Sequence, residues 1–342
     1  MEVSIAMATY NGAKYIQEQL DSLASQTTLP FELVACDDGS TDDTLHILRQ
    51  FAKSAPFPVR VYQNEKNLGF ADNFLRAASL CEAEWIGFCD QDDVWFPTKL
   101  ATVGAAIEIH CPEELMLVAH SAQRVGHDLK PIGGNEPDFR RKKLVARNKH
   151  FGFWSTNGFA CIFRGELVRE LDWTSRPRSL RHVHRCVHDQ WICMLANSLG
   201  AVLYIPEPLA YYRRHGASLT PMHTKPNTRQ LVGQSRHIGS EHYKFWAYAA
   251  EQSAATLERS STVTKGSAWS KRFGEGAQSF HKLANVCDLR SQIYDASGTL
   301  QRLWRVGALF VRGGYLGDRF YALGLLSLLK DLHFCFFGSH AK

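Results

Sequence analysis

The stretch that decides the fold reads WIGFCDQDDVW, residues 85–95. Its first five residues form an apolar run that is typical of a buried strand, and the run stops at the polar cluster Asp90-Gln91-Asp92-Asp93. Pro97 stands where a helix is expected to begin, and this helix is predicted to continue to about His110. A buried strand that ends in carboxylates and leads into a helix indicates a parallel α/β sheet.

Similar units lie on both sides of this stretch. Further strands are predicted from apolar runs at residues 3–8, 31–36, 59–62 and 115–119. Helical patterns separate the runs, and the connections are short. This alternation predicts an α/β fold with a mostly parallel central sheet and helices on both faces.

Polar residues also follow the first two predicted strands, as Thr9-Tyr10-Asn11 and Asp37-Asp38. The carboxyl ends of parallel strands meet at one edge of a sheet, and ligands bind outside that edge. We therefore expect these two clusters and residues 90–93 to lie close together in space.

The length of 342 residues fits either one large domain with an appendage or two domains. The strand–helix alternation fades beyond about residue 220. Residues 1–220 are predicted to form the α/β domain and residues 221–342 a mainly helical C-terminal extension. Residues 221–240 are polar and read as a linker, whereas residues 240–259 and 276–294 show helical patterns.

Composition excludes several classes of protein. Hydrophobic residues make up 45% of the chain and charged residues 21%, which excludes a wholly disordered chain, and the net charge of +5 does not require a nucleic-acid partner. The nine cysteines include no Cys-x-x-Cys pair, so neither a disulfide framework nor a zinc site is indicated. Because no signal peptide is visible, we expect a cytoplasmic protein.

The acidic cluster at residues 90–93 calls for a cation. Neighbouring carboxylates raise the pKa of one another unless positive charge compensates them. A hard divalent ion with oxygen ligands does this and leaves positions open for phosphate oxygens. The alternative is a solvated acidic turn that precedes the next helix.

Three other patterns each carry two interpretations. Asp37-Asp38-Gly39-Ser40 either accepts hydrogen bonds from a base or ribose, or is a turn with Ser40 or Thr41 as the N-cap of the next helix. His188-Asp189 either contains a general base or places an acid at a helix N-terminus. Residues 211–216, Tyr-Tyr-Arg-Arg-His-Gly, suit a diphosphate or a metal–phosphate site, or are a basic loop after a strand.

The C-terminal tail is basic and amphipathic. Residues 301–342 carry six Lys or Arg residues against two Asp residues, interleaved with Leu, Trp and Phe. Such a segment either lies on an anionic membrane surface or packs on the main domain with its basic residues outward.

Six stretches, in this order, resemble the family 2 glycosyltransferases of the GT-A, or nucleotide-diphospho-sugar transferase, fold. They are Ala8-Thr9-Tyr10-Asn11-Gly12, Asp37-Asp38-Gly39-Ser40-Thr41-Asp42, Asn67-Leu68-Gly69-Phe70 with Asn73-Phe74, Cys89-Asp90-Gln91-Asp92-Asp93-Val94-Trp95 with Pro97 and Lys99-Leu100, His188-Asp189-Gln190-Trp191, and Tyr212-Arg213-Arg214-His215-Gly216. The fourth and sixth are similar to a bacterial subgroup that includes rhamnosyltransferases of O-antigen and capsule assembly.

The resemblance implies a role for each matching residue. It implies Asp189 as the catalytic base. It implies a metal site for Mg²⁺ or Mn²⁺ at Asp90, Asp92 and His215. The implied nucleotide-binding residues are Thr9, Tyr10, Asn11, Asp37, Asp38, Asn67, Gly69, Asn73, Asp90 and Gln91. The implied diphosphate or acceptor contacts are Asp93, Trp95, His188, Trp191, Arg213 and Arg214.

The activity that the resemblance implies is inverting, metal-dependent transfer of one sugar from a nucleoside-diphosphate sugar, dTDP-rhamnose or a UDP-hexose, to a glycan hydroxyl. The expected acceptor is a lipid-linked polysaccharide or lipopolysaccharide at the cytoplasmic face of the inner membrane. Single transfer is expected because the Gln-x-x-Arg-Trp motif of polymerising members is missing. Two alternatives stay open: a nucleotidyltransferase, although its Gly-rich N-terminal signature is missing, and a non-catalytic glycan- or membrane-binding protein.

Overall fold

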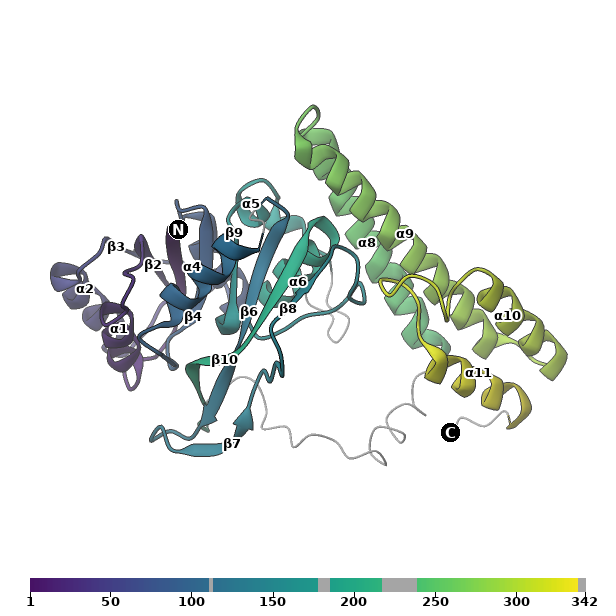
Figure 1. The fold of residues 1–342 in the computed structure, drawn as a ribbon, viewed down its shortest axis with the longest axis horizontal. Helices are drawn as coiled ribbons and strands as arrows, with labels where there is room; N and C mark the ends of the chain where they lie inside the picture. The colour runs from purple at the N-terminus through teal and green to yellow at the C-terminus, as the bar shows by residue number, and fades with distance from the viewer. Residues whose placement is uncertain (111–112, 178–184, 217–238, 338–342) are drawn as a thin grey trace. The chain divides into compact units, whose positions relative to one another are not determined.

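The computed structural model describes residues 1–110, 113–177, 185–216 and 239–337. The chain divides into two compact units (Figure 1). The first, here the α/β unit, comprises Met1–Ala146, Ser155–Thr174 and Val187–Leu219. The second, here the helical unit, comprises Arg147–Trp154, Ser175–Cys186 and Thr220–Lys342. The linker predicted at residues 221–240 lies almost wholly outside the described residues.

Four parallel strands make up the first half of the sheet, in the order β3-β2-β1-β4. Each strand is followed by a helix, which confirms the predicted α/β alternation. The bounds are β1 Val3–Thr9, α1 Ile16–Ala24, β2 Glu32–Asp37, α2 Thr44–Ser54, β3 Val59–Gln63, α3 Phe70–Ser79, β4 Trp85–Asp90 and α4 Lys99–Ile109.

The second half of the sheet is mixed. Strand β9 pairs antiparallel with both β4 and β6, and β10 pairs parallel with β6. The strand predicted at residues 115–119 is therefore longer than expected and lies one strand away from β4. The bounds are β5 Val94–Trp95, β6 Leu115–Val125, β7 Pro131–Asn135, β8 Lys143–Val145, β9 Cys161–Arg164, α5 Glu166–Arg169, α6 His188–Leu199 and β10 Ala201–Arg213.

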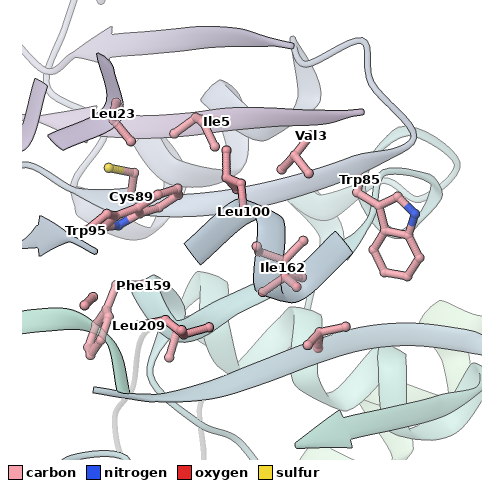
Figure 2. Packing of buried hydrophobic residues seen from close by; sticks show 14 of the residues in the cluster. Val3, Ile5, Leu23, Trp85, Cys89, Trp95, Leu100, Phe159, Ile162 and Leu209 are labelled. Atoms are coloured by element: carbon pink, nitrogen blue, oxygen red, sulfur yellow. The ribbon is translucent and has the colours of Figure 1, made fainter. Parts of the chain in front are cut away.

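The core of the α/β unit lies between the sheet and its helices. Every residue of β1 and β2 is buried, as expected for parallel strands that are covered on both faces. Figure 2 shows the side chains of Ile5, Leu100 and Ile162 pointing toward one another. Cys89 and Trp95, which flank residues 90–93, belong to the same buried cluster, so the core fixes both ends of that polar stretch.

The helical unit is built on two long helices, α8 (Ser240–Val263) and α9 (Ala268–Asp295), which pack along each other. Two shorter helices, α10 (Thr299–Val311) and α11 (Leu325–Phe337), pack on α9 and on each other (Figure 1). All four are amphipathic enough to bury one face. Among the described residues, no helix combines the length and apolar character that crossing a bilayer requires.

Candidate active site

Three of the predicted polar clusters meet at one edge of the sheet. Strand β1 lies between β2 and β4, and its register pairs Thr9 with Asp37 and Ala8 with Asp90. The three strands therefore end at the same level. The expectation that these clusters share an edge is confirmed.

Asp37 organises the turn after β2. Its buried carboxylate accepts hydrogen bonds from Thr9 Oγ1 at 2.9 Å, from Ser40 Oγ at 2.5 Å and from the Ser40 N–H at 2.9 Å. Gly39 has φ +87°, a conformation that favours glycine. The predicted N-cap at Ser40 or Thr41 is wrong, because Ser40 bonds to Asp37 and α2 begins only at Thr44.

Asp38 is held by the loop before α3. Its buried carboxylate accepts from Asn64 Nδ2 at 2.7 Å and from the N–H groups of Leu68 and Gly69 at 2.8 Å each. Asn73 accepts a further hydrogen bond from Asn64. Because the φ of Gly69 is +81°, this position requires glycine.

Two more of the predicted nucleotide contacts lie on this network. Asn67 Nδ2 donates to the carbonyl of Asp38 at 3.0 Å, and Asn73 Nδ2 donates to the carbonyl of Cys36 at 2.8 Å. The amides of both residues thus hold the backbone on which Asp38 lies. Asn64, which sequence reasoning missed, links Asp38 to Asn73.

Gln91 ties the end of β4 to the end of β1. Its side-chain amide accepts from the N–H of Tyr10 at 3.0 Å and donates to the carbonyl of Tyr10 at 3.1 Å. Asn11 accepts a hydrogen bond from the N–H of Thr41 at 2.8 Å. The Tyr10 residue itself is 50% exposed, so its ring is free to stack on a planar ligand.

An acidic centre forms from residues nearly 100 positions apart. Burial, together with the carboxylates of Asp92 and Asp189, raises the pKa of Asp90 to about 8. Burial also raises the pKa of Asp189 to about 6, although the N–H groups of Gln190 and Gly158 oppose the rise. Asp189 is the second residue of α6, so the N-terminus of that helix faces its negative charge.

His215 approaches the same centre from the end of β10. Its Nε2 lies 2.7 Å from Oδ2 of Asp92, and its ring packs against Tyr15 with 4.7 Å between the centroids. Asp92, its partner His215 and the neighbouring Asp90 are residue types that bind a divalent cation, whose positive charge would relieve the repulsion between the two carboxylates. Within the described ranges, however, no three His, Cys, Asp or Glu side chains are arranged so that they could hold a metal ion together.

Arg213 contacts the acidic loop through both its backbone and its side chain. Its N–H donates to the buried carboxylate of Asp93 at 3.0 Å, and its guanidinium donates to the carbonyl of Asp92 at 2.7 Å. The same guanidinium forms an ion pair with Glu18 of α1. Arg213 and Asp93 thus hold the acidic loop in place. The contribution of Glu18 was not predicted from the sequence.

The remaining predicted contacts lie deeper. Trp95 and Trp191 are 1% and 0% exposed, so both indoles pack in the core rather than face a ligand. His188 is buried and stacks on Phe74 with 4.2 Å between centroids, which anchors the first turn of α6. Arg214 is also buried and bonds to the hydroxyl of Tyr212.

Lys99 is a buried cation that sequence reasoning left without a role. It is 0% exposed, its Nζ donates to the carbonyl of Phe159 at 2.9 Å, and it lies 3.4 Å from the centre of the Trp95 ring. Burial lowers the pKa of Lys99 to about 7, although the carboxylates of Asp93 and Asp90 oppose the shift. Its burial could have been predicted from the sequence, because Lys99 lies beside Leu100 and four residues before Val103, on the face of α4 that is buried.

The chain is similar to known glycosyltransferases. Residues 4–164 match the profile described as Glycosyl transferase family 2. The dTDP-rhamnosyl transferase RfbG of Shigella flexneri is 38% identical over 220 residues, which cover 61% of this chain and 71% of the relative. The uncharacterized protein Rv1520 of Mycobacterium tuberculosis is 27% identical over 265 residues, which cover 75% of this chain and 67% of that protein.

The fold is also shared with a solved structure. The crystal structure of residues 1–349 of S. aureus TarS aligns with a TM-score of 0.51 and 18% sequence identity, covering 92% of this chain and 93% of that one. The sheet order, the shared acidic edge and these similarities agree. The chain belongs to family 2 of the glycosyltransferases and has their GT-A fold.

Proposed function

We propose that this glycosyltransferase moves a single sugar from a nucleoside-diphosphate donor to a hydroxyl group of a glycan acceptor, with inversion at the anomeric carbon. The observation that carries the proposal is the approach of Asp189 to Asp90, which lies 99 positions earlier in the chain and is next to Asp92 in the acidic cluster. Identity of 38% to a dTDP-rhamnosyl transferase favours dTDP-rhamnose as the donor, with a UDP-hexose as the second candidate.

Asp189 is assigned as the general base. A carboxylate whose pKa is about 6 is ionised at neutral pH and is more basic than an ordinary aspartate. It takes the proton of the acceptor hydroxyl while that oxygen bonds to the anomeric carbon. The bond from the anomeric carbon to the diphosphate oxygen breaks, and the nucleoside diphosphate leaves with the electron pair. The Gln190 N–H, 2.6 Å from Oδ1 of Asp189, orients the base.

Asp92, with His215 and Asp90, is assigned to hold Mg²⁺ or Mn²⁺. The ion, when bound, would supply positive charge opposite the departing diphosphate. Arg213 and Asp93 keep the backbone of Asp92 in place, and Tyr15 supports the ring of His215. Asp92 and His215 therefore keep a defined geometry at the edge where the three strands end.

The nucleotide is assigned to the ends of β1 and β2. The exposed ring of Tyr10 offers a face on which a base can stack, while Thr9, Asp37 and Asp38 shape the surrounding turn. Asn11, Asn67, Gly69, Asn73 and Gln91 act by positioning, because each bonds to that turn or to Tyr10.

The acceptor is proposed to be a lipid-linked polysaccharide or lipopolysaccharide, reached at the cytoplasmic face of the inner membrane. The basic, amphipathic C-terminal helices support this location.

Thermal unfolding with dTDP, UDP, GDP and CDP, each with and without Mn²⁺, tests the donor site. A ligand that binds only the folded protein adds about 2.7 kcal/mol to the free energy of unfolding at 100 times its Kd. We expect dTDP or UDP to stabilise the protein, and more strongly with Mn²⁺. No stabilisation by any nucleotide would contradict the donor assignment, and equal stabilisation with and without Mn²⁺ would contradict the metal assignment.

A further inference from the structure

Helix α10 presents an apolar face to solvent. Leu300, Trp304 and Val311 are 84%, 73% and 85% exposed. Spacings of four and seven residues place these three side chains on one face of the helix. The opposite face is buried through Val306 and Leu309. Helix α10 therefore has two apolar faces, one that packs within the helical unit and one that is exposed.

Helix α11 shows the same arrangement. Its buried face contains Phe334 and Cys335 and is pinned by Asp331, whose carboxylate bonds to Arg290 of α9. This ion pair determines which face of α11 points outward. The outward residues, all more than half exposed, are Leu325, Leu326, Leu329, Phe336 and Phe337.

Positive charge borders these two faces. Arg312 and Arg319, in the segment between the helices, are both exposed. The two acids of residues 299–337 are engaged within the unit, since Asp318 pairs with Lys149 and Asp331 pairs with Arg290. The outward faces of α10 and α11 are thus apolar, and among the described residues neither Arg312 nor Arg319 forms an ion pair with an acid of this segment.

We propose that α10 and α11 bind flat on a membrane surface that contains anionic phospholipids. Each helix has 13 residues, about 20 Å, and is shorter than the roughly 30 Å hydrocarbon layer, so each lies along the interface. Tryptophan favours the headgroup region, phenylalanine and leucine form the apolar face of interfacial helices, and arginines attract anionic headgroups. The outward side chains of both helices enter the boundary between headgroups and acyl chains.

A second copy of the chain fits this surface less well. A two-fold contact between copies would place the same surface on both sides. Arg312 and Arg319 would then approach their own counterparts, and like charges would oppose the contact. The anionic membrane provides the complementary charge that a second copy lacks.

This inference extends the proposed membrane-bound acceptor, and vesicle binding without donor separates the two. Flotation of the full chain is measured with phosphatidylcholine vesicles, alone and with roughly 30% phosphatidylglycerol. We expect binding to the anionic vesicles that weakens in high salt. A double variant, Trp304→Ser with Leu326→Ser, is expected to lose binding by about tenfold or more.

The matched control is Val263→Ser at the end of α8. Val263 and Leu326 are both 83% exposed, so both substitutions remove one equally exposed apolar side chain. We expect the control to bind like the unaltered chain. Replacing Arg312 and Arg319 by Gln should weaken binding about fivefold per arginine, on anionic vesicles only. Melting temperatures of all variants establish that they are folded.

Three outcomes overturn the proposal. The first is no flotation of the unaltered chain with anionic vesicles at low salt. The second is an equal loss of binding in Val263→Ser and the double variant. The third is a concentration-dependent dimer in sedimentation that Leu326→Ser dissolves without any vesicle binding, which would assign the surface to a second copy. None of these depends on transfer activity.

Discussion

Carboxylates in the two units differ in how their negative charge is compensated. In the helical unit, Asp331 is 0% exposed and is fully satisfied: Arg290 Nε lies 2.8 Å from its Oδ2, and the hydroxyls of Tyr294 and Tyr315 donate to it at 2.5 and 2.7 Å. In the α/β unit, the partly buried Asp90 faces the carboxylates of both Asp92 and Asp189, and the pKa values of Asp90 and Asp189 are raised.

This difference in charge compensation distinguishes a carboxylate that stabilises the fold from carboxylates that serve the reaction. A buried carboxylate with a cation and donors around it stabilises the fold, and removing it leaves its partner uncompensated. Carboxylates that repel one another lower the free energy of unfolding, and such groups are typical of sites that bind a ligand. Substitution of the carboxylates at the acidic centre should therefore lower activity without lowering stability. Substitution of Asp331 should lower stability.

The largest expected effect is the loss of transfer in Asp189→Asn. The amide cannot accept the hydroxyl proton, so kcat should fall by roughly 10²- to 10⁴-fold while donor affinity stays nearly unchanged. Release of nucleoside diphosphate in the presence of acceptor measures kcat, and calorimetry measures donor affinity. Asp21→Asn, an exposed acid on α1, is the control. Near-normal transfer by Asp189→Asn would refute the base assignment.

Next comes the stability of Asp331→Ala. Because the substitution leaves Arg290 buried without its carboxylate, the free energy of unfolding should fall by about 3–5 kcal/mol. Urea unfolding measures it, with Asp288→Ala, an exposed acid on α9, as control. The double variant Arg290→Met with Asp331→Leu should recover much of the loss. Equal stability of Asp331→Ala and Asp288→Ala would show that the ion pair does not hold α11.

Gly69→Ala should cost about 1–3 kcal/mol in the free energy of unfolding, because an alanine is strained at φ +81°. A Cβ at Gly69 meets no atom within 4 Å, so backbone strain and not a clash is responsible. Nucleotide affinity should fall as well, since the Gly69 N–H holds Asp38. Gly134→Ala, which is equally open but has an ordinary φ, is the control. The prediction fails if both variants unfold at the same urea concentration.

The pH dependence of transfer offers a finer test. Protonation of a base whose pKa is about 6 should lower kcat/KM by about tenfold for each pH unit below 6. An initial-rate profile from pH 5 to 8 measures this limb. The residual activity of Asp189→Asn should lack it. A limb that persists unchanged in the variant would assign the titration to another group.

The smallest expected effect is a gain in stability when Asp90 is replaced, whereas replacing Asp331 lowers stability. The folded protein keeps the proton of Asp90 up to a pH of about 8, well above the ordinary value of 3.8, so the free energy of unfolding falls as pH rises between them. Without metal and nucleotide, Asp90→Asn should raise the melting temperature at pH 8 by a few degrees, for about 1 kcal/mol. Asp331→Asn should lower it. A lower melting temperature for both variants would remove the contrast.

The sequence alone predicted the α/β alternation and the shared acidic edge. Apolar runs of strand length, each followed by a helical pattern, leave few other arrangements, and parallel strands bring their carboxyl ends together. Asp90, Asp92 and Asp189 were identified in this way and through the family resemblance. These predictions depend on local patterns and on rules of sheet topology, which the order of residues carries directly.

Only the tertiary structure decided which polar residues share a contact. Glu18 and Arg213 are 195 residues apart, and no local pattern links them. Asp92 and His215 are 123 apart, and only the family resemblance grouped them before the structure showed their contact. The burial of Lys99 beneath the acidic loop and the outward faces of α10 and α11 likewise emerged only from packing. A side chain's partners depend on which distant segments fold against it, and that is settled by the burial of the whole core rather than by its neighbours in sequence.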